Sequence, residues 1–181
     1  DLSISTANAG TDKVINCYAS SVNLSANAVP ANTSYSWTAI NGGHIVSGNS
    51  TASPLVDAAG CYALLVTNTL TGCTSKDTAC VTTDLSTPSL TCGPGAQLSC
   101  SNPTATIGVI PVAGVTYSWS GLGIVGVSTG SSIVVNKADN YSVVATKTSN
   151  GCTATCSINV TQDLSISTAN AGTDKVINCY A

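Results

Sequence analysis

The sequence contains no arginine, glutamate, phenylalanine or methionine, and its five lysines are outnumbered by eight aspartates. Binding to DNA or RNA through counterion release needs clustered lysine and arginine, so this composition argues against a nucleic-acid partner. No apolar run approaches the roughly 20 residues that a membrane-spanning helix requires. We therefore expect no membrane insertion within these residues.

Catalytic and metal-binding motifs are also missing. The single histidine, His44, follows Gly42 and Gly43 and has no evident carboxylate partner in the sequence. No GxSxG, HExxH or phosphate-binding glycine loop occurs, so we interpret His44 as an exposed loop residue and expect no enzyme. There is no CxxC pair and no DxDxDG loop, which argues against zinc and calcium, and we expect no cofactor. Asp1 and Asp84 are interpreted as turn caps in preference to calcium ligands.

What the sequence does contain is a repeat. Residues 1–19 recur without a substitution as residues 163–181, which gives a period of 162 residues. A match that includes polar positions indicates a recently duplicated unit. Residues 163–181 are therefore expected to form the first strands of the next repeat.

A weaker internal repeat divides each period in two. Its matched positions are Cys17 with Cys100, Tyr35-Ser36-Trp37 with Tyr117-Ser118-Trp119, Tyr62 with Tyr141, and Gly72-Cys73-Thr74 with Gly151-Cys152-Thr153. We predict two related modules, at residues 1–83 and 84–162. The joins between modules contain no run of glycine or proline, so we expect a stiff array.

Each module alternates short apolar–polar segments with turn residues, a pattern typical of strands. No segment shows the apolar period of a helix, so the fold class is predicted to be all-β, with immunoglobulin-like β-sandwich modules and almost no helix. The expected strands are 2–5 and 14–17, 22–26, 34–37, 44–46, 54–56, 61–67 and 78–83, then 85–91, 104–110, 116–120, 121–127, 132–135, 141–146 and 153–160.

Four aromatic residues are candidates for the cores of these modules. Trp37 and Trp119 each lie in an alternating strand, where a buried indole supplies a large apolar area. Tyr62 and Tyr141 resemble the tyrosine corner of β-sandwiches, in which the hydroxyl bonds to upstream backbone. The alternative role for the two tryptophans is stacking on carbohydrate, which would require exposed indoles.

The cysteines predict disulfides and an oxidising compartment. Each period holds eight, four per module, and an even count in small modules favours disulfides over free thiols. Equivalence of the two modules predicts the shared pairs Cys17–Cys73 and Cys100–Cys152. The pairs that remain in each module are Cys61–Cys80 and Cys92–Cys156. Cys179, the next copy of Cys17, is expected to be unpaired within this chain.

Together these features resemble a known class of proteins. The cysteine ahead of an alternating strand, the Tyr-x-Trp strand, the Gly or Asp followed by Tyr, and the Gly-Cys-Thr hairpin are similar to immunoglobulin-like and PKD-like repeats of giant bacterial surface proteins. Gliding-motility adhesins of the Bacteroidetes are rich in such repeats. The resemblance implies secreted, tandem β-sandwiches that extend a binding tip or form a surface filament.

Three functional hypotheses follow for an extracellular or cell-surface protein. The first is a stiff, disulfide-stabilised shaft of a bacterial filament or long adhesin, whose partners are further copies of the repeat. The second is an adhesin module that binds glycans or cell surfaces. The third is a pilus-like subunit that assembles by strand exchange through residues 163–181. Candidate glycosylation positions are the sequons at Asn23 and Asn49, and Thr78 in an Asp-Thr-Ala motif similar to Bacteroidetes O-glycosylation sites.

Overall fold

The computed structural model describes residues 6–27, 31–166 and 168–175. These residues form strands and connecting loops, with no helix among them, which confirms the all-β prediction. Accordingly, the described ranges contain no helix long and apolar enough to cross a membrane. The strands are β1 Lys13–Asn16, β2 Val22–Asn23, β3 Thr33–Ile40, β4 Ile45–Ser47, β5 Leu55–Val56, β6 Gly60–Asn68, β7 Thr74–Asp84, β8 Ala96–Ser99, β9 Ala105–Gly108, β10 Val115–Ser120, β11 Ile124–Val125, β12 Ser132–Val135, β13 Asp139–Lys147 and β14 Thr153–Asp163.

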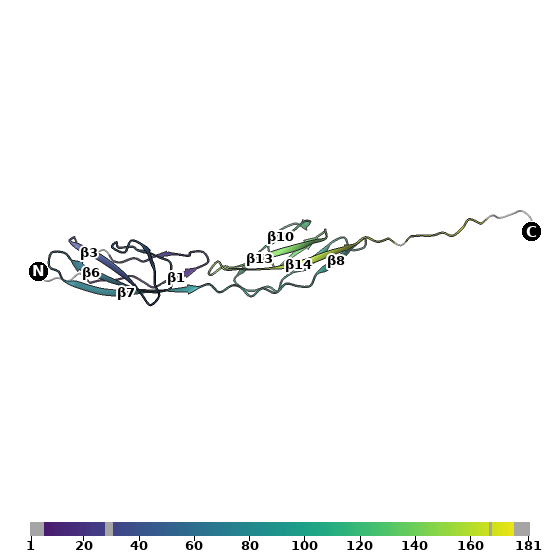
Figure 1. The fold of residues 1–181 in the computed structure, drawn as a ribbon. Helices are drawn as coiled ribbons and strands as arrows, with labels where there is room; N and C mark the ends of the chain where they lie inside the picture. Colours follow the sequence, from purple (N-terminus) through teal and green to yellow (C-terminus); the bar gives the residue numbers. More distant parts are fainter. Residues whose placement is uncertain (1–5, 28–30, 167, 176–181) are drawn as a thin grey trace, which may run out of the picture. The chain divides into compact units, whose positions relative to one another are not determined.

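The first seven strands form two sheets, one in the order β1-β7-β6-β3 and one in the order β2-β5-β4. β6 pairs antiparallel with both β3 and β7. A short turn joins β6 to β7, whereas β4 and β5 lie between β3 and β6 along the chain. β1 instead pairs parallel with β7, from Lys13 opposite Val81 to Asn16 opposite Asp84. Figure 1 labels the strands of this four-stranded sheet. The parallel pair places the end of β1 beside the end of β7.

One apolar core joins these two sheets. Alternate residues of a strand point to opposite faces, and in β6 the alternation buries Tyr62, Leu64 and Val66. Trp37 of β3 and Val56 of β5 lie in the same cluster, so side chains from both sheets meet there. Each fully buried aliphatic side chain contributes about 1.5–3 kcal/mol.

The second seven strands repeat this arrangement. Their sheets have the orders β10-β13-β14-β8 and β11-β12-β9. β8 pairs parallel with β14, from Ala96 opposite Val160 to Ser99 opposite Asp163, in the same register as β1 and β7. Buried side chains come again from both sheets: Leu98, Ile107, Trp119, Ile133, Tyr141, Val143, Ile158 and Val160. Two sheets of four and three strands around each core, with parallel first and last strands, define an immunoglobulin-like sandwich.

One predicted strand is absent. Residues 85–91 form no strand, and regular structure resumes only at Cys92, which makes a single bridge to Val109. Pro88 cannot donate a backbone hydrogen bond to a ladder, and Ser86 already bonds with the end of β7. The predicted strand 2–5 lies outside the described residues.

The chain forms two compact units. The first comprises residues 1–90, 111–117 and 144–155, and the second comprises residues 91–110, 118–143 and 156–181. The first unit thus includes the hairpin between β13 and β14. The module boundaries at residues 83/84 and 162/163 stay a prediction.

Candidate functional site: the Asp84 cluster

The candidate site lies at Asp84, the last residue of β7. Because Asn16 pairs with Asp84, the next residue of the chain, Cys17, follows the end of β1 at this point. A tight turn holds the segment there. The Asn16 side-chain oxygen accepts hydrogen bonds from the backbone nitrogens of Tyr18 and Ala19, at 3.0 and 3.1 Å.

The hairpin between β13 and β14 supplies the other half of the site. Gly151 has a φ of 74°, a conformation that glycine adopts without steric cost, and its nitrogen donates to the Lys147 carbonyl at 2.8 Å. The next residue, Cys152, is fully buried and forms a disulfide with Cys17, with 5.0 Å between their Cα atoms. Both cysteines belong to the first compact unit.

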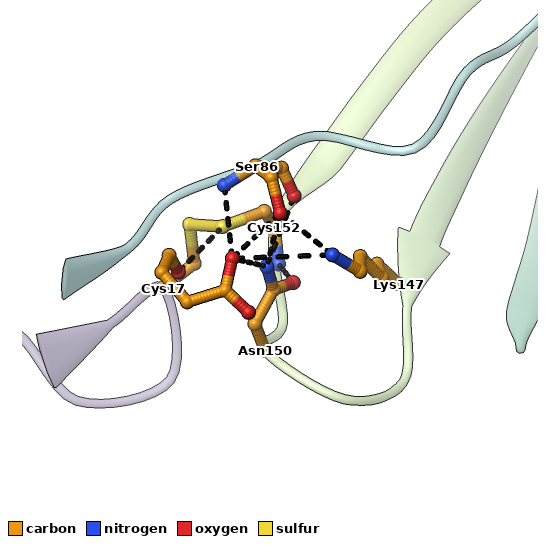
Figure 2. Close-up of polar contacts among 6 residues, drawn as sticks. Cys17, Ser86, Lys147, Asn150 and Cys152 are labelled. Carbon is orange, nitrogen blue, oxygen red and sulfur yellow. Dashed lines mark hydrogen bonds and ion pairs between the residues drawn. A yellow bond between two sulfur atoms is a disulfide. The ribbon is translucent and has the colours of Figure 1, made fainter. Parts of the chain in front are cut away.

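A buried amide connects the hairpin to Asp84. Asn150 is 1% exposed, and its Nδ2 donates to Asp84 Oδ1 at 3.0 Å and to the Ser86 carbonyl at 2.9 Å. Its Oδ1 accepts from the Cys152 nitrogen at 3.0 Å, so both ends of the amide are satisfied. Lys147 Nζ lies 2.6 Å from Ser86 Oγ and 3.9 Å from Asp84 Oδ1. Figure 2 shows Ser86, Lys147 and Asn150 beside the disulfide. We call these three residues, together with Asp84 and the two cysteines, the Asp84 cluster.

The hydrogen bonds favour the ionised form of Asp84. The Ser86 hydroxyl, then the Asn150 amide and the Ser86 backbone, and least of all the Lys147 charge, hold the pKa of this carboxyl below its usual value. The same cap forms at the next Asp-Leu-Ser sequence, where Ser165 donates to Asp163 through its nitrogen at 2.9 Å and its hydroxyl at 2.6 Å. These bonds lower the pKa of Asp163 as well.

An aromatic ring covers the hairpin glycine. A Cβ atom built on Gly151 would meet three ring atoms of Tyr18 at 2.6 to 2.8 Å. A side chain larger than hydrogen therefore cannot occupy position 151 without displacing Tyr18. The equivalent glycine of the β6–β7 hairpin, Gly72, has no atom within 4 Å of such a Cβ.

Two disulfides of the structure agree with the pairs expected from the sequence. Cys61 and Cys80 lie opposite each other on β6 and β7, with Cα atoms 4.0 Å apart. Cys92 is bonded to Cys156 of β14, with Cα atoms 6.2 Å apart.

The two shared pairs differ from the expectation. Cys17 is bonded to Cys152, and among the described residues Cys73 and Cys100 have no disulfide. Cys73 precedes the first residue of β7, whereas Cys17 lies beside its last, and eleven strand residues separate these ends by about 30 Å. A disulfide needs Cα atoms within about 7 Å, so Cys17 cannot reach Cys73. The same geometry along β14 separates Cys100 from Cys152.

Cys179 lies outside the described residues.

The four predicted core aromatics lie in the sandwich cores. Trp37 and Trp119 are 3% and 4% exposed, and their indole nitrogens donate to the carbonyls of Thr51 and Gly130. The Tyr62 hydroxyl donates to the Ala58 carbonyl at 2.6 Å.

Tyr141 makes the equivalent bond to the carbonyl four residues upstream, that of Lys137, at 2.8 Å, and it also contacts the Leu122 carbonyl. Burial, with a smaller effect of the Asp139 charge, raises the pKa of Tyr141. Both hydroxyls thus bond to upstream backbone, as a tyrosine corner does.

His44 has a partner that the sequence analysis did not identify. Its Nδ1 lies 2.6 Å from Asp57 Oδ1, because the antiparallel pairing of Ile45 with Val56 places the residues beside them opposite each other. The two side chains are 65% and 41% exposed, and exposed ion pairs contribute about 0–1 kcal/mol. No group of three potential metal ligands gathers within the described ranges.

The candidate glycosylation positions Asn23, Asn49 and Thr78 are all exposed. Their accessibility leaves modification as a prediction.

Sequence reasoning predicted that Asp84 caps a turn, which its hydrogen bonds from Ser86 confirm, but it missed the cluster around this residue. One signal of the cluster was present. Asp-Leu-Ser stands at positions 1, 84 and 163, at the start of every predicted module. The Asp and Ser of this tripeptide make the cap at Asp84 and at Asp163. Lys147 and Asn150 carried no comparable signal, because their counterparts in the first module are Asn68 and Thr71.

Comparison with known proteins finds resemblance only among solved structures. No family model matches the chain, and no curated protein matches its sequence. The chain is similar to the three N-terminal domains of the highly immunogenic outer capsid protein (Hoc) of bacteriophage RB49, with 19% identity and a TM-score of 0.46, covering 87% of this chain and 58% of that one.

The chain is also similar to the titin domains Z1Z2 in complex with telethonin, with 15% identity and a TM-score of 0.37 over 89% of this chain and 97% of that one. It is similar as well to extracellular domains 3–5 of Drosophila OTK, with 10% identity and a TM-score of 0.30 over 87% of this chain and 64% of that one. Because all three TM-scores lie below 0.5, the assignment of the fold depends on the strand topology, cores and disulfides. These define an all-β protein of immunoglobulin-like sandwiches that is linked by disulfides.

Proposed function

We propose that this chain is a structural repeat unit of an extracellular bacterial filament or long surface adhesin, in which it acts as a stiff, disulfide-stabilised shaft. The identity of residues 1–19 with residues 163–181 supports a tandem array of such units. Three disulfides support an oxidising, extracellular location.

The observation that carries the proposal is the disulfide between Cys17 and Cys152, which are separated by 135 positions. A pull on the two ends of the chain passes from position 17 through the sulfur atoms to position 152. Residues 18–151 are therefore outside the shortest covalent path between the ends. Tension cannot extend them while the disulfide is intact, which is the property that a shaft requires.

The glycan-binding alternative loses its main support, because both indoles are buried and their nitrogens are bonded to backbone. An exposed aromatic platform on each module would have favoured it. We therefore assign the tryptophans to the cores and retain the shaft as the function.

Immunogold electron microscopy tests this function. An antibody raised against the 181-residue chain is applied to intact cells that produce the protein and to thin sections of the same cells. We expect gold particles in rows along thin fibres at the cell surface. Labelling of isolated globular particles alone, or of the cell interior alone, would contradict the shaft.

A further inference from the structure

We propose that Cys100 of each period forms a disulfide with Cys73 of the next copy of the period. The two cysteines that have no disulfide within the described residues would then complete a continuous series of cross-links. The inference rests on the tandem array in the proposed function. It assigns the partner of each cysteine as a second copy of this repeat.

The first observation concerns Cys100. It is exposed, and it follows β8 as Cys17 follows β1. The two parallel pairs have the same register, so Ser99 lies opposite Asp163 as Asn16 lies opposite Asp84. The turn is the same too. The backbone nitrogen of Ser99 donates to the Asn102 carbonyl at 3.0 Å, and the backbone nitrogen of Asn16 donates to the Ala19 carbonyl at 3.0 Å. Cys100 is therefore presented at Asp163 as Cys17 is presented at Asp84.

The second observation concerns the hairpin of Cys73. Gly72 has a φ of 72°, against 74° for Gly151. The Asn68 nitrogen donates to the Cys73 carbonyl at 2.9 Å, as that of Lys147 does to the Cys152 carbonyl at 2.9 Å. The β6–β7 hairpin thus has the backbone conformation in which the β13–β14 hairpin carries its disulfide.

The third observation is that the cap which receives the hairpin is already formed at the next join. Ser165 bonds to Asp163 as Ser86 bonds to Asp84. On the hairpin side, Thr71 takes the place of Asn150, and its hydroxyl accepts from the Cys73 nitrogen at 3.3 Å. Both halves of a second cluster are therefore present in this chain, namely the cap at Asp163 and the hairpin that carries Cys73.

The two kinds of join differ in their other contacts. At the second join Asn68 replaces Lys147 and Ser101 replaces Tyr18, so the ion pair and the aromatic cover of the hairpin glycine are both lost. The Cys100–Cys73 disulfide consequently contributes a larger part of the interactions at the second join than Cys17–Cys152 contributes at the first.

Alternating disulfides enclose the whole array. The loop closed by Cys100 and the next copy's Cys73 begins inside the 17–152 loop of one copy and ends inside the same loop of the next. Every peptide bond between the outermost disulfides then lies within at least one covalent loop. A single proteolytic cut would leave the filament connected.

Formation of each disulfide is a two-electron oxidation. The two thiols lose two protons and two electrons, and a sulfur–sulfur bond forms. The electrons and protons pass to the disulfide of a thiol–disulfide oxidoreductase in the export compartment, which becomes a dithiol.

A two-copy chain tests the pairing. It consists of residues 1–162 followed directly by residues 1–166, so it contains the repeat twice and ends before Cys179. The test variant carries Cys73→Ser in its first copy and Cys100→Ser in its second, which leaves only the pair that we propose. The matched control carries Cys100→Ser in its first copy and Cys73→Ser in its second, which leaves only the outer two cysteines.

Monomers of both variants are isolated in oxidising buffer, denatured, and labelled with a thiol alkylating agent for intact-mass and peptide analysis. We expect no labelled thiol in the test variant and labelling of both Cys73 and Cys100 in the control. Labelled Cys100 and Cys73 in the test variant, or equal labelling of the two variants, would overturn the inference.

The failure of the pairing can be told apart from the failure of the function. Surface fibres whose Cys73 and Cys100 remain free would support the proposed shaft and contradict the Cys100–Cys73 pairing. The Cys100–Cys73 disulfide in a protein that forms no surface fibre would support the pairing and contradict the shaft.

Discussion

Cys17 and Cys152 are separated by 135 positions in the sequence, yet their Cα atoms lie 5.0 Å apart and their sulfur atoms are bonded. The parallel pairing of β1 with β7 places Cys17 beside Asp84, and the hydrogen bonds of Asn150 hold the β13–β14 hairpin at the same point. The disulfide and the hydrogen bonds thus join the same hairpin to the ends of β1 and β7.

Removal of this disulfide should destabilise the protein. In the loop-entropy model, a closed loop of this length stabilises by about 4–5 kcal/mol, before any strain is subtracted. We expect C17S/C152S to lower the urea midpoint measured by fluorescence. The matched control is C73S/C100S, which removes two cysteines that have no disulfide in the described part of the chain. Equal midpoints for the two double variants would contradict the assigned pairing.

The packing of Tyr18 on Gly151 can be measured with a matched pair of glycines. Gly151→Ala and Gly72→Ala both place a Cβ at a φ near +73°, which costs about 1–2 kcal/mol. Only Gly151→Ala also meets the Tyr18 ring. We expect its thermal midpoint to fall further, and Tyr18→Ala to remove the difference between the two variants. A difference that persists without the tyrosine ring would show that this contact is not its cause.

Acid should weaken the Asp84 cluster. The pKa of Asp84 is lowered in the fold, so its contribution is complete above the unfolded value near 3.9 and is lost as the pH falls through the folded pKa. Because the Ser86 hydroxyl is the largest cause, we expect Ser86→Ala to raise the pKa of Asp84 towards its usual value. Titration of the Asp84 carboxyl carbon by NMR measures this directly. An unchanged pKa in Ser86→Ala would contradict the role given to the hydroxyl.

The sequence was sufficient to predict the all-β fold, because alternation and turn residues act locally. The burial of Trp37 also followed from the alternation of its strand, and the hydroxyl bond of Tyr62 followed from its resemblance to a tyrosine corner. The strand expected at residues 85–91 failed because Ser86 bonds with Asp84 and with the distant Asn150, and strand alternation does not show the second of these contacts.

Disulfide pairing was the part that pattern could not supply. Equivalence of the modules correctly identified Cys17 with Cys100 and Cys73 with Cys152 as matching positions. It could not decide between bonds within a module and bonds to a neighbour. That choice depends on the direction in which β1 pairs with β7, because parallel pairing places Cys17 and Cys73 at opposite ends of β7. No single-sequence signal fixes that direction.

Single-molecule extension tests the central claim that the Cys17–Cys152 disulfide carries the load. At roughly 3.4 Å per residue, the oxidised 181-residue chain pulled from its ends should reach a full length of about 160 Å, because only residues 1–17 and 152–181 lie on the covalent path. With only the other two disulfides left, C17S/C152S should reach a full length of about 340 Å. A full length near 340 Å for the unmodified oxidised protein would contradict the account.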